Sequence, residues 1–377
     1  MIRNQDIDVQ MQLYQARLLL EEGSNEKSLS LLETIQTDNE RQQGDVAYLL
    51  GWCYIQRRQW KEAILFLSPL LDHYQSDFTQ EATRDQGRLA CYLLYLGIAA
   101  MNLEHYEDAS LHFQLCLKVL HDRRIHLPAV RVQACYSLAM TCVMRGLYTA
   151  AIQHYEEALR LCQHFNRDEE LAPIYYGLCE TYRHLGDYVK SYLVGQEALH
   201  LYQERAEREM EAETHHLLGR ICFLLRNFRQ ASDHYTESLS LSTVCDKPTI
   251  ALLNYAALAD LRLAEGRLDE AKLYCQRAIE TIERTDHTHI RGAVYQAIGK
   301  VTQNEARQVI GTQRRDLLER AFAWYKKAEV QLATTQAYTV IAEVYSNQAQ
   351  VLEELGRAQD AIERWRQAYG VLSHAKV

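Results

Sequence analysis

The chain has 377 residues, of which 47% are hydrophobic and 24% are charged, an ordinary balance for a soluble globular protein. Its formal net charge of −9 argues against general binding to nucleic acid, whose phosphates need a basic surface. No apolar run approaches the roughly 20 residues that cross a bilayer, and no signal-peptide pattern is present. The 10 cysteines form no C-x-x-C pair, so we expect free thiols in a reducing cytoplasm.

A small residue recurs at the same place in successive segments of the chain and serves as an anchor for counting. Four successive intervals between anchors are 40 residues, and leucine usually precedes the anchor. Another small residue follows 12 positions later, as Ala63 follows Gly51. Two antiparallel helices approach closely only where side chains are small, so the pattern predicts a repeated helix pair. The anchors are Gly51, Gly97, Ala139, Cys179, Gly219, Ala259, Gly299 and Ala349.

Glycine often stands seven residues after the anchor. Gly146, Gly186, Gly266 and Gly356 occupy this place. Glycine readily adopts the left-handed conformation that ends many helices, so this position predicts the turn inside each helix pair.

In chain order, the anchor residues and turn glycines divide a single repeat array of about nine helix pairs into four stretches. The first is a degenerate repeat, the second holds the regular repeats, the third contains an insertion, and the fourth is a C-terminal repeat with its cap. Their bounds are 1–43, 44–289, 290–332 and 333–377. A polar loop is expected at 75–86, where one interval lengthens to 46 residues.

The insertion lies in the eighth repeat. From Gly299 to Ala321 the interval is 22 residues instead of 12, with Gly311 as the expected turn. We expect both helices to be longer and to protrude as a hairpin. This hairpin is either a contact for a partner or a tolerated surface extension.

The pairs Leu50-Gly51, Leu96-Gly97 and Leu218-Gly219, the turn glycine and the alternation of alanine with large apolar residues resemble the tetratricopeptide repeat. The longer period resembles the sensor domains of bacterial helix-turn-helix regulators and the peptide receptors of quorum sensing. The resemblance implies an all-α, right-handed superhelical solenoid that binds a protein or peptide in its concave groove. No DNA-binding domain is recognisable, so we expect no direct contact with nucleic acid and none with a membrane.

Candidate ligand residues lie on the outward face of each first helix, 3 residues before the anchor and 1, 4 and 5 after it. In the early repeats these positions are aromatic or methionine. They suit an apolar partner, or else they pack against the neighbouring repeat, and both interpretations stay open. The early candidates are Tyr48, Trp52, Tyr136, Met140 and Met144.

The later repeats place polar and charged residues at the same positions. Glu180, Arg220, Asp260 and Lys300 alternate in sign at steps of 40 residues. They either grip the charges of a peptide or form a ladder of ion pairs along the groove. The remaining later candidates are Tyr176, Arg183, His184, His216, Phe223, Gln303 and Asn304.

Sequence motifs for catalysis are missing. The chain has no phosphate-binding G-x-x-x-x-G-K-[ST], no dinucleotide fingerprint and no H-E-x-x-H, so we expect neither an enzyme nor a metal or other cofactor. The leading hypothesis is a cytoplasmic, non-catalytic module that binds a protein or peptide in a bacterial regulatory system. The alternative is a self-assembling scaffold, with a homodimer contact through the C-terminal helix that carries Trp365 and Tyr369.

Overall fold

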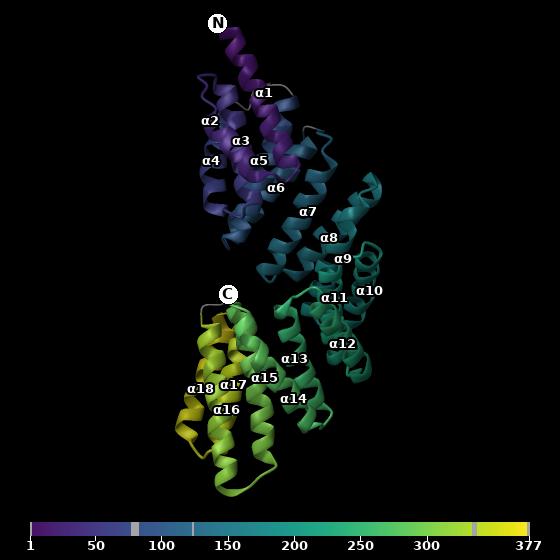
Figure 1. Ribbon diagram of the computed structural model, residues 1–377, viewed down its shortest axis with the longest axis vertical. Coiled ribbons are helices and arrows are strands. Elements are labelled where there is room, and N and C mark those ends of the chain that lie inside the picture. Colours follow the sequence, from purple (N-terminus) through teal and green to yellow (C-terminus); the bar gives the residue numbers. More distant parts are fainter. Residues whose placement is uncertain (1, 77–82, 123, 334–337, 375–377) are drawn as a thin grey trace. The chain divides into compact units, whose positions relative to one another are not determined.

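The computed structural model describes residues 2–76, 83–122, 124–333 and 338–374. These residues form eighteen α-helices and two short 3-10 turns, with no strand among them. The expected all-α repeat fold is therefore confirmed. The chain divides into two compact units, 1–187 and 188–377, and each is a succession of helices that pack on their neighbours in sequence (Figure 1).

The first unit holds nine helices within its described residues. They are α1 (Ile2–Glu21), α2 (Asn25–Thr34), α3 (Glu40–Gln56), α4 (Trp60–Ser76), α5 (Thr83–Asn102), α6 (Tyr106–Asp122), α7 (Pro128–Met144), α8 (Tyr148–Phe165) and α9 (Leu171–Leu185). The ends of the loop expected at 75–86 lie in α4 and α5, and its middle, 77–82, is outside the described residues. The odd-numbered helices contact each other in turn, so they form one row.

The second unit also holds nine helices among its described residues. They are α10 (Tyr188–Glu204), α11 (Arg208–Leu224), α12 (Phe228–Val244), α13 (Pro248–Ala264), α14 (Leu268–Thr281), α15 (Thr288–Arg307), α16 (Gly311–Leu332), α17 (Tyr338–Glu354) and α18 (Ala358–His374). Here α11, α13, α15 and α17 contact each other in turn. We call these four helices the first-helix row of the second unit.

The anchor glycines allow the two helices of a pair to touch. A Cβ atom added at Gly97 would lie 2.5 Å from the Phe113 ring, and one at Gly219 would lie 2.6 Å from the Tyr235 ring. Each ring stands 16 residues after its anchor. In the lengthened pair α15–α16 the ring against Gly299 belongs to Tyr325 instead, because the insertion delays it by ten positions.

The turn glycines have the left-handed conformation that their position predicts. Gly266 has φ of 76°, its N–H donates to Leu263 O at 3.0 Å, and Arg267 N–H donates to Arg262 O at 2.8 Å. These two bonds cap the last turn of α13. Arginine takes the same conformation where glycine is missing, at Arg58 with φ of 57° and Arg226 with φ of 61°.

The insertion lengthens its own helix pair. α15 has 20 residues and α16 has 22, against 17 in α11, α12 and α13. The connection between them is residues 308–310, and Gly311, expected as the turn, is the first residue of α16, with φ of 71°. The C-terminal stretch expected at 333–377 contains α17 and α18, and its residues 334–337 and 375–377 lie outside the description.

All ten cysteines are free thiols, and eight of them are buried, among them Cys53, Cys142 and Cys222. They fill small spaces between helices as apolar side chains do. Within the described residues, no helix has the length and apolar character that crossing a membrane requires.

Candidate functional site

The early aromatic candidates lie at the contact between neighbouring first helices. The Tyr48 ring of α3 lies 5.0 Å from that of Tyr92 and 6.0 Å from that of Tyr95, both on α5. Trp52 stacks on Tyr95 with centroids 6.3 Å apart. Burial raises the pKa of Tyr95 to about 12 and also raises that of Tyr48. Of the two open interpretations, the contacts favour packing between repeats, and the sequence reasoning missed Tyr92 and Tyr95.

On α7 the candidates differ in exposure. The Tyr136 ring lies 6.0 Å from that of Tyr155 on α8, and its pKa is raised by burial and by the charge of Glu180. Met140 is half-buried, whereas Met144 is 58% exposed. Met144 is thus the member of this group that offers an apolar surface to a partner.

The candidates of α9 form a small polar cluster at its end. Glu180 Oε1 lies 4.0 Å from a terminal nitrogen of Arg183, and that nitrogen lies 2.9 Å from His184 Nε2. The His184 ring stacks on Tyr148, with centroids 5.1 Å apart and planes only 6° apart. Tyr176 is half-buried on the same helix. His184 is therefore held by packing against α8 as well as by its polar neighbour.

His216 on α11 is fixed by a buried amide of the next first helix. Its Nδ1 lies 2.9 Å from Oδ1 of Asn254, which is fully buried on α13. The amide nitrogen of Asn254 donates to Ser238 Oγ at 2.7 Å and to Ile250 O at 2.9 Å. Because Asn254 Oδ1 can only accept, His216 Nδ1 carries the proton. The neighbouring candidate Phe223 packs on Phe228 with centroids 5.7 Å apart.

The charged positions of the second unit are only partly paired. Lys300 Nζ lies 3.7 Å from Asp260 Oδ2 and 2.8 Å from Glu343 Oε1. Burial raises the pKa of Asp260 against the opposing effect of Lys300, and Asp260 Oδ1 has no hydrogen-bond partner. Burial lowers the pKa of Lys300, but the two carboxylates together raise it above its ordinary value.

Arg220 stands apart from this chain of ion pairs. It is exposed on α11, and no carboxylate of the described residues lies within ion-pairing distance of it. The predicted ladder therefore exists between Asp260 and Lys300 but does not reach Arg220. It continues instead to Glu343 on α17. The repeat pattern does not predict Glu343, because the equivalent position, one residue after the anchor Ala349, is Gln350.

Two late candidates use their amide groups for contacts within the protein. Gln303 is 3% exposed, accepts a hydrogen bond from the Tyr325 hydroxyl at 3.0 Å and donates to Glu354 at 2.9 Å. The expectation that Gln303 is available to a ligand is wrong, because Tyr325 and Glu354 hold its amide in the interior. Asn304 donates its amide to the backbone oxygen of Lys300 at 2.9 Å and is half-buried.

The comparisons with known proteins place these helices in a family. The sequence model of the MalT-like TPR region matches residues 93–364. No curated protein sequence matches the chain.

Solved structures resemble the whole chain in fold. The apo form of RapI has a TM-score of 0.72 at 11% identity, with 98% of each chain covered. The apo form of the quorum sensor NprR from B. thuringiensis has a TM-score of 0.68 at 14% identity. The match covers 97% of this chain and 99% of the NprR chain. A Rap protein complexed with competence and sporulation factor has a TM-score of 0.59 at 12% identity. The match covers 98% of this chain and 99% of the Rap chain. At such identities the likeness concerns the fold alone.

Proposed function

We propose that this chain, which belongs to the family of MalT-like TPR regions, is a non-catalytic module that binds a peptide or protein segment along its first helices. The structures of like fold support the peptide class, since the quorum sensor NprR was also solved in complex with its cognate peptide NprX. We extend the proposal to a regulatory role in the bacterial cytoplasm.

One observation carries the proposal: Arg220 is exposed and has no ion-pair partner among the described residues, on the same row of helices as the paired charges of Asp260, Lys300 and Glu343. A guanidinium group without a carboxylate is ready to hold a peptide carboxylate by two parallel hydrogen bonds. A peptide amine can compete with Lys300 for Asp260, whose Oδ1 accepts no hydrogen bond. A carboxylate and an amino group of a bound peptide thus find complementary groups on two neighbouring first helices.

The spacing of the row sets the manner of binding. Packed helices lie roughly 8–10 Å apart, and an extended chain advances about 3.3 Å per residue. A peptide along the first-helix row therefore meets a new helix about every three residues. Contact with all four helices α11, α13, α15 and α17 requires a ligand of about nine residues.

The test is affinity selection from a random nine-residue peptide pool, read by mass spectrometry. The wild type is compared with Arg220→Glu and with Arg226→Glu. Both arginines are exposed and lack an ion pair among the described residues, but Arg226 lies in the turn between α11 and α12. Peptides retained by the wild type and the control but lost from Arg220→Glu support the proposal. Equal retention by all three proteins, or none by any, contradicts it.

A second candidate function, self-assembly as a scaffold, rests on the terminal helices. Each carries exposed apolar residues at helical spacing, which is how a helix presents a contact face. On α18 they are Ile362, Trp365, Tyr369 and Leu372, with exposed fractions of 52%, 38%, 76% and 42%. On α1 they are Ile7, Met11, Tyr14 and Leu18, with exposed fractions of 57%, 67%, 66% and 38%.

Light scattering after size-exclusion chromatography tests this candidate. Tyr369→Glu should convert an oligomer to a monomer, whereas Leu273→Glu, at a 48% exposed leucine on α14, should not. A wild-type monomer at high concentration rules out self-assembly through α18.

A further inference from the structure

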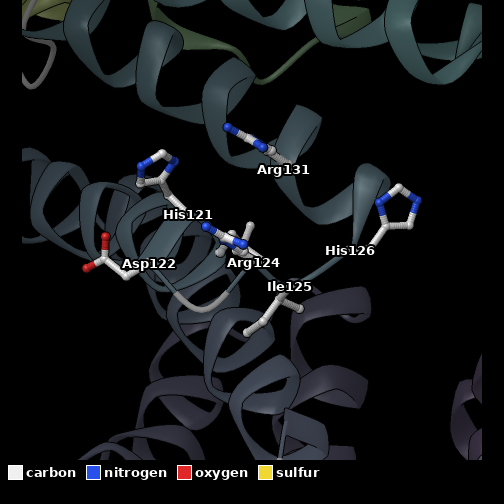
Figure 2. A pocket seen from close by; sticks show the side chains of 7 residues that line it. His121, Asp122, Arg124, Ile125, His126 and Arg131 are labelled. Atoms are coloured by element: carbon white, nitrogen blue, oxygen red, sulfur yellow. The ribbon is translucent and has the colours of Figure 1, made fainter.

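The connection between α6 and α7 in the first unit surrounds a hollow that plays no part in the proposed peptide site. Its volume is about 510 Å³, and its lining includes His121, Asp122, Arg124, His126 and Arg131 (Figure 2). This volume is in the range of pockets that hold small molecules.

The walls of the hollow are fixed by the fold. Arg124 N–H donates to His121 O and Ile125 N–H to Leu120 O, each at 3.1 Å, which caps α6 and holds Arg124 at φ of 52°. The His126 ring packs edge-on against Phe165 of α8, with centroids 5.4 Å apart. The backbone of the connection and the His126 ring are therefore held in place before any ligand arrives.

The charge of this connection is unlike that of the other connections between helix pairs. There, each cation has a carboxylate: Arg167 pairs with Glu170, Arg205 with Glu207 and Lys247 with Glu209. Neither Arg124 nor Arg131 has an ion-pair partner among the described residues.

The two guanidinium groups of the hollow extend toward the same side of it (Figure 2). Figure 2 shows the guanidinium groups of Arg124 and Arg131 extending toward the side of the hollow where the His121 ring lies, with the Asp122 carboxylate turned away. Two positive charges without an ion pair among the described residues thus line one hollow.

We propose that this hollow binds a small soluble oxyanion through a phosphate or carboxylate group. Planar guanidinium groups match the oxygens of both groups with paired hydrogen bonds, and two of them bracket a single anion. A polymer such as nucleic acid, or an anionic membrane, is disfavoured because the whole chain carries a net charge of −9 that repels an extended anionic surface.

Titration calorimetry with inorganic phosphate and with citrate, at constant ionic strength held by sodium chloride, tests the proposal. The wild type should bind at least one of the two anions at a single saturable site, and the stronger of them identifies the chemical class. Loss of one charged hydrogen-bonding group weakens binding about tenfold, so Arg124→Asn should show this loss and Arg124→Asn/Arg131→Gln a larger one.

Arg226→Asn is the matched control, because Arg226 is also an exposed arginine at positive φ without an ion pair among the described residues. It should bind as the wild type does. Asparagine tolerates the left-handed conformation, so neither substitution should unfold the protein. Nuclear magnetic resonance of the wild type adds a measurement that needs no variant, since the anion should shift the Ile125 and His126 amide signals. Absence of saturable binding to both anions, or an equal loss in Arg226→Asn, overturns the proposal.

Discussion

The Nδ1 atoms of His215 and His234 face each other at 3.0 Å across the contact between α11 and α12. One ring must donate and the other accept, so the accepting imidazole is neutral in this arrangement. Burial, with a smaller contribution from His234, lowers the pKa of His215 to about 4. Burial also lowers the pKa of His234, although Asp233 opposes that effect.

This pair predicts a loss of stability in mild acid. In the unfolded chain both histidines bind protons below about pH 6.5, whereas in the folded chain the pKa of His215 is about 4 and that of His234 is also lowered. The free energy of unfolding is therefore unaffected by the pair above pH 6.5 and falls between pH 6.5 and 4. The drop attributable to His215 amounts to at most about 3 kcal/mol.

Urea unfolding at pH 7.5 and pH 5.0 measures this effect. The comparison is between the wild type and His215→Gln, because other acid-sensitive groups affect both proteins alike. The difference in unfolding free energy between the two proteins should shift in favour of the variant at pH 5.0. A difference independent of pH would show that the pair does not stay neutral.

The anchor glycine predicts a steric effect. A Cβ atom at position 219 would lie 2.6 Å from the Tyr235 ring, which is 2% exposed and has little room to move. We expect Gly219→Ala to lower the free energy of unfolding by about 1 to 3 kcal/mol. Thermal unfolding followed by circular dichroism measures it. Gly370→Ala in α18 is the control, since nothing lies within 4 Å of the new Cβ and helix propensity should make it neutral or stabilising.

The chain of ion pairs predicts coupling between Lys300 and Asp260. Lys300→Met leaves the Asp260 carboxylate without its cation. Because 28% of Lys300 and 34% of Asp260 are exposed, we expect a loss of only about 1 to 2 kcal/mol. Adding Asp260→Asn to the Lys300→Met variant should restore part of the lost unfolding free energy. A double-mutant cycle measured by urea unfolding would show this. Lys272→Met, which removes a more exposed pair with Glu305, should cost less than about 1 kcal/mol. Equal losses for the two lysines would contradict a special role of Lys300.

The sequence predicts the repeats well because their cause is local. The need for a small residue against a large ring recurs at fixed spacing, so the contacts of Gly97 and Gly219 follow from counting. The turn at Gly266 follows from the backbone conformation that glycine permits. Neither feature depends on what distant parts of the chain do.

The site is less predictable because the reach of long side chains decides it. Lys300 turns toward Glu343, which lies seven residues before the position that the repeat indicates. Gln303 is covered because its amide bonds Tyr325 of α16 and Glu354 of α17, side chains that its position on the helix face does not reveal. Tyr48 meets Tyr95 across repeats, and its position on a helix face could not distinguish that packing from exposure to a ligand.

Hydrogen–deuterium exchange with and without a selected peptide tests the central claim most directly. If the ligand lies on the first-helix row of the second unit, exchange should slow in α11, α13, α15 and α17 and change less in α12, α14 and α16. Arg220→Glu should abolish the slowing at the same peptide concentration, and Arg226→Glu should leave it unchanged. Slowing confined to α1 or α18, or equal slowing in the wild type and Arg220→Glu, would contradict binding along the row.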